Sequence, residues 1–159
     1  MDRNSPSAQA GSMSTNFRRM ACGPEDVFAV LADGWLFPVW VVGASRMRNV
    51  DDTWPAEGSE LQHSFGVWPA LINDDTTMLE WDPPRHAMMR PKGWPMGEAH
   101  VQIDVRPIGS GCIVRMKEAA VAGPGKYVPP ALLDIVMSVR NVETLKRLAF
   151  IAEGRNRNE

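Results

Sequence analysis

Three polar residues with useful chemistry interrupt apolar patterns in this sequence. His63 alternates in phase with Phe65 along a predicted strand, and Glu118 alternates in phase with Met116 along another. Asn141 interrupts the apolar stripe of a predicted C-terminal helix. If these apolar faces line a cavity, the three polar groups point into it, and groups placed in this way fix the orientation of a bound ligand.

The same residues could also carry out proton transfer. A buried Glu118 without a partner would have a raised pKa, and a nearby His63 could exchange a proton with it close to neutral pH. Asn141 could polarise a carbonyl group. His63 and Glu118 are therefore the candidate catalytic residues. In the alternative interpretation each group is satisfied locally by backbone or water and has a structural role only.

Three tryptophans lie where predicted elements meet. Trp40, Trp68 and Trp94 could form an aromatic gate over a ligand, or they could fill the core and anchor loops. The complete set of candidate ligand-binding residues is Trp40, His63, Phe65, Trp68, Trp94, Met116, Glu118, Met137 and Asn141.

No cofactor or metal ion is predicted. The three histidines have no metal-ligand spacing, and Cys22 and Cys112 are far apart in the sequence. The segment 109–111 lacks the third glycine of a dinucleotide-binding fingerprint. The segment 123–126 lacks the leading glycine and the following Ser or Thr of a phosphate-binding loop.

Two further groups of residues have simple expected roles. Arg140, Glu143 and Arg147 share one helix stripe and are predicted to form a solvated row of salt bridges. Cys22 and Cys112 are predicted to be reduced, with a disulfide between them as the alternative.

The elements that position these residues follow from periodicity and from Pro and Gly punctuation. A strand at 14–20 leads into a helix that begins at Pro24, and a short second helix follows within 35–42. A long helix over 130–153 ends the pattern, and its apolar start is expected to be covered on several sides. The six predicted strands between these helices are 45–50, 60–67, 76–81, 85–90, 98–106 and 112–120.

Composition limits the protein class. The 159 residues are 44% hydrophobic and 23% charged, which is typical of one globular domain. The net charge of −2 argues against nucleic-acid binding, and no apolar run is long enough for a membrane segment. We expect a cytoplasmic protein with a disordered leader over 1–12, one domain over 13–154 and a flexible tail over 155–159.

The order of the elements resembles the α+β helix-grip (START-like) fold, in which a curved seven-stranded antiparallel sheet wraps around a long C-terminal helix and two short helices follow strand 1. Nearly the whole chain also resembles a bacterial branch of the polyketide cyclase/dehydrase and lipid-transport family, within the SRPBCC superfamily. The segments that carry this resemblance are 33–36, 40–47, 66–70, 93–95 and 140–145. The resemblance implies a cavity between sheet and helix but no particular reaction.

These observations favour one function and leave two alternatives. The favoured function is binding or carriage of a small hydrophobic ligand, possibly aromatic or polyketide-like, in a cavity of at least ~300 Å³. The first alternative is a polyketide cyclase or dehydratase that uses the same cavity. The second is a protein-interaction module without a ligand.

Overall fold

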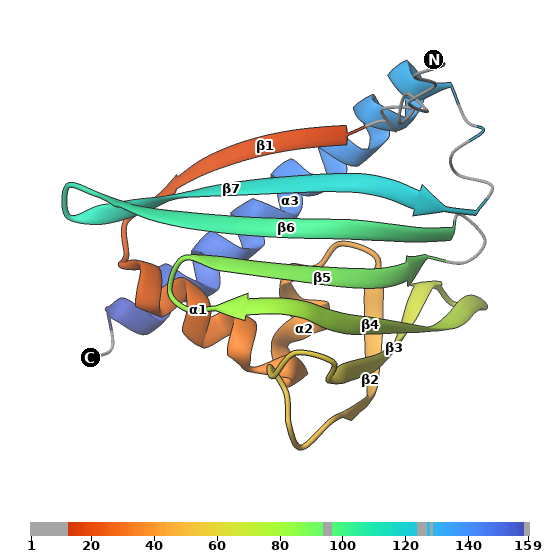
Figure 1. The fold of residues 1–159 in the computed structure, drawn as a ribbon, viewed down its shortest axis with the longest axis horizontal. Helices are drawn as coiled ribbons and strands as arrows, with labels where there is room; N and C mark the ends of the chain where they lie inside the picture. Colours follow the sequence, from red (N-terminus) through yellow and green to blue (C-terminus); the bar gives the residue numbers. More distant parts are fainter. Residues whose placement is uncertain (1–12, 94–96, 124–126, 128, 158–159) are drawn as a thin grey trace, which may run out of the picture.

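A seven-stranded antiparallel sheet curves around one long helix in the computed structural model, which describes residues 13–93, 97–123, 127 and 129–157 (Figure 1). The strand order is β1-β7-β6-β5-β4-β3-β2. The strands are β1 (Met13–Met20), β2 (Ala44–Val50), β3 (Glu60–Val67), β4 (Ala70–Asp82), β5 (His86–Gly93), β6 (Gly97–Ile108) and β7 (Gly111–Ala122). The helices are α1 (Pro24–Ala32), the 3₁₀ helix η1 (Gly34–Leu36), α2 (Phe37–Trp40) and α3 (Pro130–Asn156).

This arrangement is the helix-grip fold, as the sequence predicts. Figure 1 shows α3 crossing one face of the sheet diagonally, with α1 and α2 beside the sheet near the C-terminal half of α3. The first and last strands pair with each other, so that β1 and β7 bring the two ends of the sheet sequence together.

Local sequence signals determine where α1 begins. Gly23 is the N-cap in extended conformation, and Pro24 is the first helical residue, where its missing N–H leaves no bond unmade. The carboxylate of Asp26 accepts a hydrogen bond of 2.9 Å from the backbone N–H of Gly23. This hydrogen bond satisfies one N–H group at the helix start and stabilises a short helix whose apolar side packs into the core.

The core lies under the C-terminal half of α3. Leu145, Leu148 and Ala152 of this helix are fully buried, and they belong to the same apolar cluster as Ile103 and Val114 of the sheet. Burial of each of the two leucine side chains contributes roughly 1.5–3 kcal/mol. This half of the helix is therefore the anchor of the fold.

The N-terminal half of α3 differs from the sequence expectation. Leu132, Ile135, Val139 and Val142 are exposed in the structure, although we expected the apolar start of the helix to be covered on several sides. The reason is geometric, since the sheet faces this half on one side only (Figure 1). The side of α3 that faces the sheet does not pack directly on it here, because the cavity described below lies between them.

Two boundaries also differ from the prediction. β4 begins at Ala70, well before the predicted start at Thr76, because the β3–β4 hairpin pairs without interruption from Val67 opposite Ala70. α3 continues to Asn156, so the first residues of the predicted tail are helical. The predicted leader over 1–12 lies outside the described residues.

The two cysteines lie side by side at one end of the sheet. Cys22 follows β1, and Cys112 pairs with Met20 at the start of β7. Both side chains are buried, and both thiols are free. Burial raises the pKa of Cys22 to about 12 and also raises the pKa of Cys112, so both thiols stay protonated.

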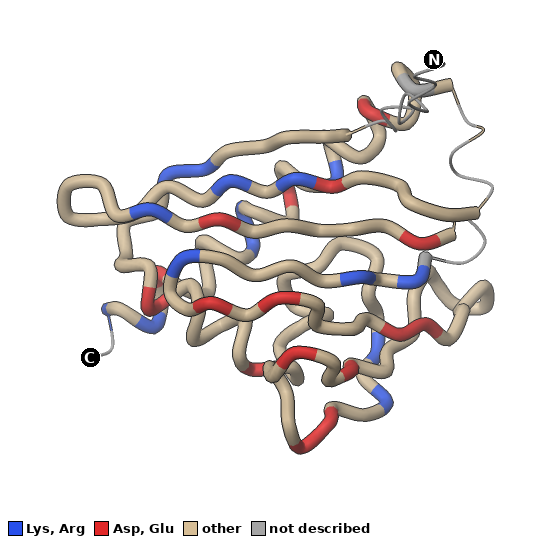
Figure 2. The backbone as a smooth tube through the Cα atoms, in the orientation of Figure 1, with Lys and Arg blue, Asp and Glu red and all other residues tan. Residues whose placement is uncertain are grey.

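Charged residues of both signs are mixed over the sheet. Figure 2 shows both basic and acidic positions on β6 and on β7. None of the helices in the described part of the chain is both long and apolar enough to cross a membrane.

Candidate functional site

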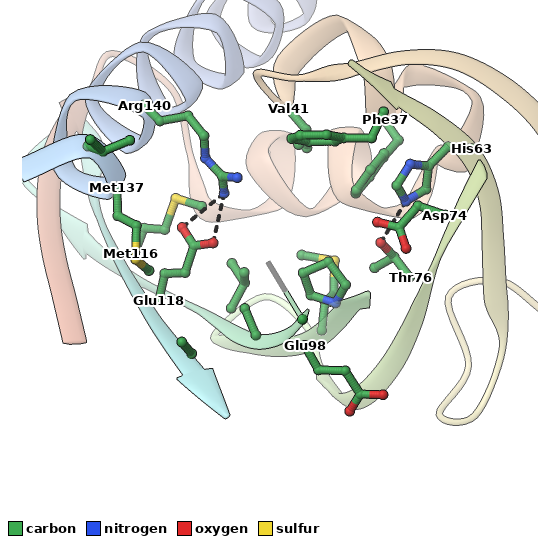
Figure 3. Close-up of a pocket in the computed structure, with 18 of the residues that line it drawn as sticks. Phe37, Val41, His63, Asp74, Thr76, Glu98, Met116, Glu118, Met137 and Arg140 are labelled. Carbon is green, nitrogen blue, oxygen red and sulfur yellow. Dashed lines mark hydrogen bonds and ion pairs between the residues drawn. The ribbon is translucent and has the colours of Figure 1, made fainter. Parts of the chain in front are cut away.

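A cavity of about 290 Å³ lies between the concave face of the sheet and the N-terminal half of α3 (Figure 3). This volume is marginally below the ~300 Å³ that the sequence analysis set as a minimum, and it lies at the low end for ligand pockets. The described side chains that line it include Phe37, Trp40, Val41, Phe65, Met89, Val101, Met116, Ala120, Leu133, Val136 and Met137, together with the polar His63, Asp74, Thr76, Glu98, Glu118 and Arg140. The wall is thus mostly apolar, with a few polar groups.

One polar group of the wall is the ion pair between Glu118 and Arg140. Atom Nη2 of Arg140 donates hydrogen bonds of 2.9 Å to both carboxylate oxygens of Glu118. The Glu118 side chain is 5% exposed and that of Arg140 is 27% exposed. Because an ion pair in such a position compensates the buried charge, the expectation of an unpartnered Glu118 was wrong.

The same contact corrects the expected row of salt bridges on α3. Arg140 leaves this row and points to the sheet, whereas Glu143 pairs with Arg147 at 3.0 Å and with Lys146 at 3.7 Å on the solvent side. Sequence reasoning missed the role of Arg140 at the cavity. The available signal was its spacing, since Arg140 follows Met137 by three residues and therefore lies on the same helix face.

His63 stands at the opposite end of the cavity. Its Nε2 lies 2.9 Å from the Oγ1 of Thr76, and its ring packs at 4.9 Å from the ring of Phe37. Its buried Nδ1 has no hydrogen-bond partner among the described residues. Burial lowers the pKa of His63 to about 4, with a smaller opposing effect of Asp75, so the ring is neutral at neutral pH.

Asp74 is a second residue of the site that sequence reasoning did not find. It pairs directly opposite His63 in the β3–β4 ladder, so both side chains lie on the concave face. Asp74 is only 6% exposed, and burial raises its pKa to about 6. Figure 3 shows its carboxylate directed into the cavity beside His63 and Thr76.

The structure brings six of the nine predicted ligand-binding residues to the cavity. They are Trp40, His63, Phe65, Met116, Glu118 and Met137. Trp68 differs from the expectation, because it lies in the β3–β4 turn with 81% of its surface exposed and does not line the cavity. Trp94 lies outside the described residues.

Asn141 also lies away from the cavity wall. It is fully buried on α3, and neither its Nδ2 nor its Oδ1 has a hydrogen-bond partner among the described residues. One residue further along the helix than Arg140, its side chain turns by about 100° away from the face that borders the cavity. The proposed polarisation of a ligand carbonyl by Asn141 is therefore not supported by its position.

A glycine behind the wall determines where Phe65 can lie. Gly43 has a φ of +100°, and a Cβ at this position would lie 2.3 Å from the Cζ of Phe65. Both the conformation and the close approach require glycine. The Phe65 ring consequently fills the space between Gly43 and the cavity.

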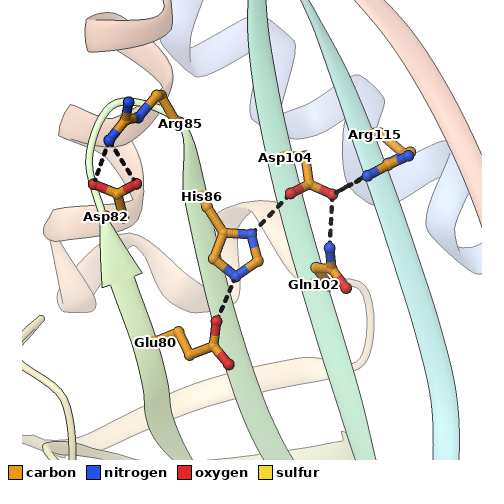
Figure 4. A network of polar contacts seen from close by, with 7 residues as sticks. All are labelled: Glu80, Asp82, Arg85, His86, Gln102, Asp104 and Arg115. Atoms are coloured by element: carbon orange, nitrogen blue, oxygen red, sulfur yellow. Dashed lines mark hydrogen bonds and ion pairs between the residues drawn. The ribbon is translucent and has the colours of Figure 1, made fainter.

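A second polar network lies on the convex face of the sheet, away from α3 (Figure 4). His86 lies 2.8 Å from Asp104 and 2.9 Å from Glu80, while Arg115 donates two hydrogen bonds to Asp104. Burial opposes protonation of His86, but its hydrogen bonds with Asp104 and Glu80 raise its pKa overall. These contacts couple four neighbouring strands and do not reach the cavity.

The cavity can therefore bind an apolar body and offer polar contacts at two ends. The ion pair of Glu118 and Arg140 marks one end, and His63, Asp74 and Thr76 mark the other (Figure 3). Within the described residues, no cluster of three His, Cys, Asp or Glu side chains could hold a metal ion.

Comparisons with known proteins identify the fold. No protein-family model and no curated protein sequence matches the chain. A solved protein of Nitrosomonas europaea has 17% identity and a TM-score of 0.70, over 94% of this chain and 99% of its own. The di-domain ARO/CYC StfQ from the steffimycin biosynthetic pathway has 13% identity and a TM-score of 0.71, over 91% of this chain and 51% of its own.

A third solved structure, Ara h 8.0201, has 9% identity and a TM-score of 0.65, over 88% of this chain and 96% of its own. These likenesses are consistent with a START/SRPBCC-like fold. At such low identity they establish the fold alone, so that function has to be argued from the site.

Proposed function

We propose that this protein binds a small hydrophobic, ring-bearing molecule in the cavity between the sheet and α3. The observation that carries the proposal is the cavity of about 290 Å³ itself, with its largely apolar wall and polar groups at two ends. Such a combination is typical of small-molecule sites. Phe37, Trp40 and Phe65 offer aromatic surfaces, which favour a ring over a flexible chain.

The sequence resemblance and the fold neighbours support this proposal. The segments noted above resemble the polyketide cyclase/dehydrase and lipid-transport family, and the fold neighbours include StfQ, an ARO/CYC. Both support the binding of a small hydrophobic ligand by a protein of this fold. We infer that carriage or binding is the primary role.

A blocking substitution tests the proposal. Ala120 lines the cavity, and the next residue, Val121, is exposed on the opposite face of β7. We expect 2-naphthalenemethanol to bind the parent saturably in a titration followed by tryptophan fluorescence, with Trp40 as the reporter in the wall. Ala120→Phe should abolish binding because its ring fills the cavity, whereas Val121→Phe should bind like the parent.

Two results would contradict the proposal. Absence of saturable binding to the parent would show that the cavity does not accept a ring of this size. Equal binding by the parent and by Ala120→Phe would show that the probe binds elsewhere. Near-UV circular dichroism of both variants establishes that each retains the packed fold.

Asp74 favours one second candidate, a cyclase or dehydratase acting in the same cavity. A carboxyl group with a pKa of about 6 is suited to act as a general base near neutral pH. In this role Asp74 would remove a proton from the carbon next to a ligand carbonyl. The test is deuterium uptake by 2-acetonaphthone in heavy water, measured by mass spectrometry, which the parent should accelerate and Asp74→Asn should not.

A further inference from the structure

The charges of the cavity wall do not balance. The charge of Glu118 is compensated by Arg140, which binds both of its oxygens. Among the described residues, no cation forms an ion pair with the carboxylate of Asp74, and the backbone of Asp75 is its hydrogen-bond partner. Arg48 donates to the backbone oxygen of Asp74 at 3.1 Å and pairs with the side chain of Asp75 at 3.3 Å. The buried end of the cavity thus holds an uncompensated acidic group.

The surroundings of Asp74 are suited to a cation with an apolar body. Phe37 and Trp40 are in contact at 5.5 Å, and their rings line the cavity together with Phe65. Aromatic rings attract a positive charge through their quadrupoles, most strongly where water is excluded. A ligand cation beside Asp74 would also offset the cost of burying the ionised carboxylate.

The charges of the cavity wall disfavour an anionic ligand. Its charge would lie near Asp74, while the guanidinium of Arg140 is already neutralised by Glu118. Glu98 adds a further carboxylate to the lining, although Figure 3 shows it directed away from the other labelled polar groups. Repulsion by Asp74 and the uncompensated cost of removing the ligand charge from water therefore disfavour a carboxylate ligand.

We propose, on the basis of the proposed ligand-binding function, that the occupant of the cavity is a ring-bearing amine whose protonated nitrogen donates a hydrogen bond to the carboxylate of Asp74. The rings of the ligand lie against Phe37, Trp40 and Phe65. A charge-assisted hydrogen bond of this kind is roughly twice as strong as a neutral one, which gives selectivity over an alcohol of the same shape.

The proposal predicts that binding depends on pH through Asp74. Affinity for the amine should fall as pH decreases through the pKa of about 6, because the protonated carboxyl group loses its charge. The charged or titratable groups around Asp74 are Asp75 on β4, His63 on β3, Arg48 on β2, Lys92 on β5, Glu98 on β6, Glu118 on β7 and Arg140 on α3.

Three probes with one naphthalene body separate charge from shape. They are 2-naphthylmethylamine, 2-naphthalenemethanol and 2-naphthoic acid, each titrated into the full chain by calorimetry at about pH 7.5 and about pH 5. We expect the amine to bind about tenfold more tightly than the alcohol at the higher pH, with the acid the weakest. The preference for the amine should shrink at the lower pH, while alcohol binding stays constant.

Matched variants assign the preference to one carboxylate. Asp74→Asn should remove the advantage of the amine over the alcohol, and a near-UV circular dichroism spectrum like that of the parent establishes that the variant is folded. Asp75→Asn changes the neighbouring charge on the other face of β4 and should keep the amine preference.

Other outcomes would contradict either the amine assignment alone or the proposed ligand-binding function as well. Equal affinity of amine and alcohol, or an amine preference that persists in Asp74→Asn, overturns the amine assignment and leaves hydrophobic binding in place. Failure of all three probes to bind overturns both this inference and the proposed function.

Discussion

Glu118 of β7 and Arg140 of α3 are joined by two hydrogen bonds of 2.9 Å, both donated by the same guanidinium nitrogen. The contact links the sheet to the half of α3 that otherwise exposes apolar side chains to solvent. It lies in the cavity wall, so it positions the helix over the ligand site while it neutralises the buried carboxylate. Stability and site geometry therefore depend on the same pair of residues.

Removal of Arg140 should destabilise the protein strongly. Arg140→Met leaves Glu118 buried without its cation, and we expect the free energy of unfolding to fall by about 3 kcal/mol, at the low end for buried pairs because Arg140 is partly exposed. Urea denaturation measures the effect. The double variant Glu118→Gln/Arg140→Met should recover much of the loss. Arg147→Met, which breaks an exposed pair, is the control and should cost less than ~1 kcal/mol.

Asp74→Asn should stabilise the protein at neutral pH. The pKa of Asp74 rises from 3.8 to about 6 on folding, so the native state holds a proton that the unfolded state loses between these values. The parent therefore loses stability as pH rises through this interval. We expect the variant to be more stable by on the order of 3 kcal/mol at most at pH 7. The difference should disappear near pH 4, and a difference independent of pH would contradict the assignment.

His63 should contribute a pH dependence of opposite sign. Its pKa falls from 6.5 to about 4 on folding, so the unfolded state binds a proton in this interval that the native state does not. The contribution of neutral His63 to the free energy of unfolding is fully present above pH 6.5 and is lost as the pH falls towards about 4. Comparison of Asp74→Asn with Asp74→Asn/His63→Gln in urea isolates this effect from that of Asp74.

His86 supplies the comparison for that experiment. The pKa of His86 is raised in the folded state, so its stabilising contribution is present at low pH and is lost as pH rises. The advantage of the parent over His86→Gln should therefore grow as pH falls, whereas the advantage conferred by His63 should shrink. Slopes of the same sign for both histidines would contradict their placement.

Trp40 and Trp68 should respond differently to removal. Trp40 is 2% exposed and packs against Phe37, so Trp40→Ala should cost about 3–5 kcal/mol in urea denaturation. Trp68→Ala removes a side chain that is mostly in solvent and should change stability by less than ~0.5 kcal/mol. Similar losses in both variants would mean that Trp68 packs against the domain.

The order of elements was predictable because local signals carry it. Pro24 after Gly23 marks the start of α1, and the strict alternation over 98–106 marks the centre of β6. The early part of β4 was missed because Asn73, Asp74 and Asp75 are residues typical of turns. Pairing with β3 overrides that preference, and such pairing is not visible in one strand alone.

Asp74 and Arg140 were not predicted as site residues because strand register and distant packing partners determine their positions. Asp74 can be placed beside His63 only when Val67 is known to pair with Ala70, since that pair fixes every other pair of the hairpin. Arg140 fits equally well with Glu143 on its own helix and with a group on the sheet. Only the packing of α3 against β7 decides between these partners.

Gly43 has a consequence for how the site can be altered. The Phe65 ring stands between this glycine and the cavity, so a side chain at position 43 could be accommodated only by displacement of the ring. The volume of the cavity therefore depends on Gly43, a residue that does not itself line the cavity. Redesign of ligand size should begin with the Gly43–Phe65 pair, because it offers a way to adjust volume without changing any polar group that selects the ligand.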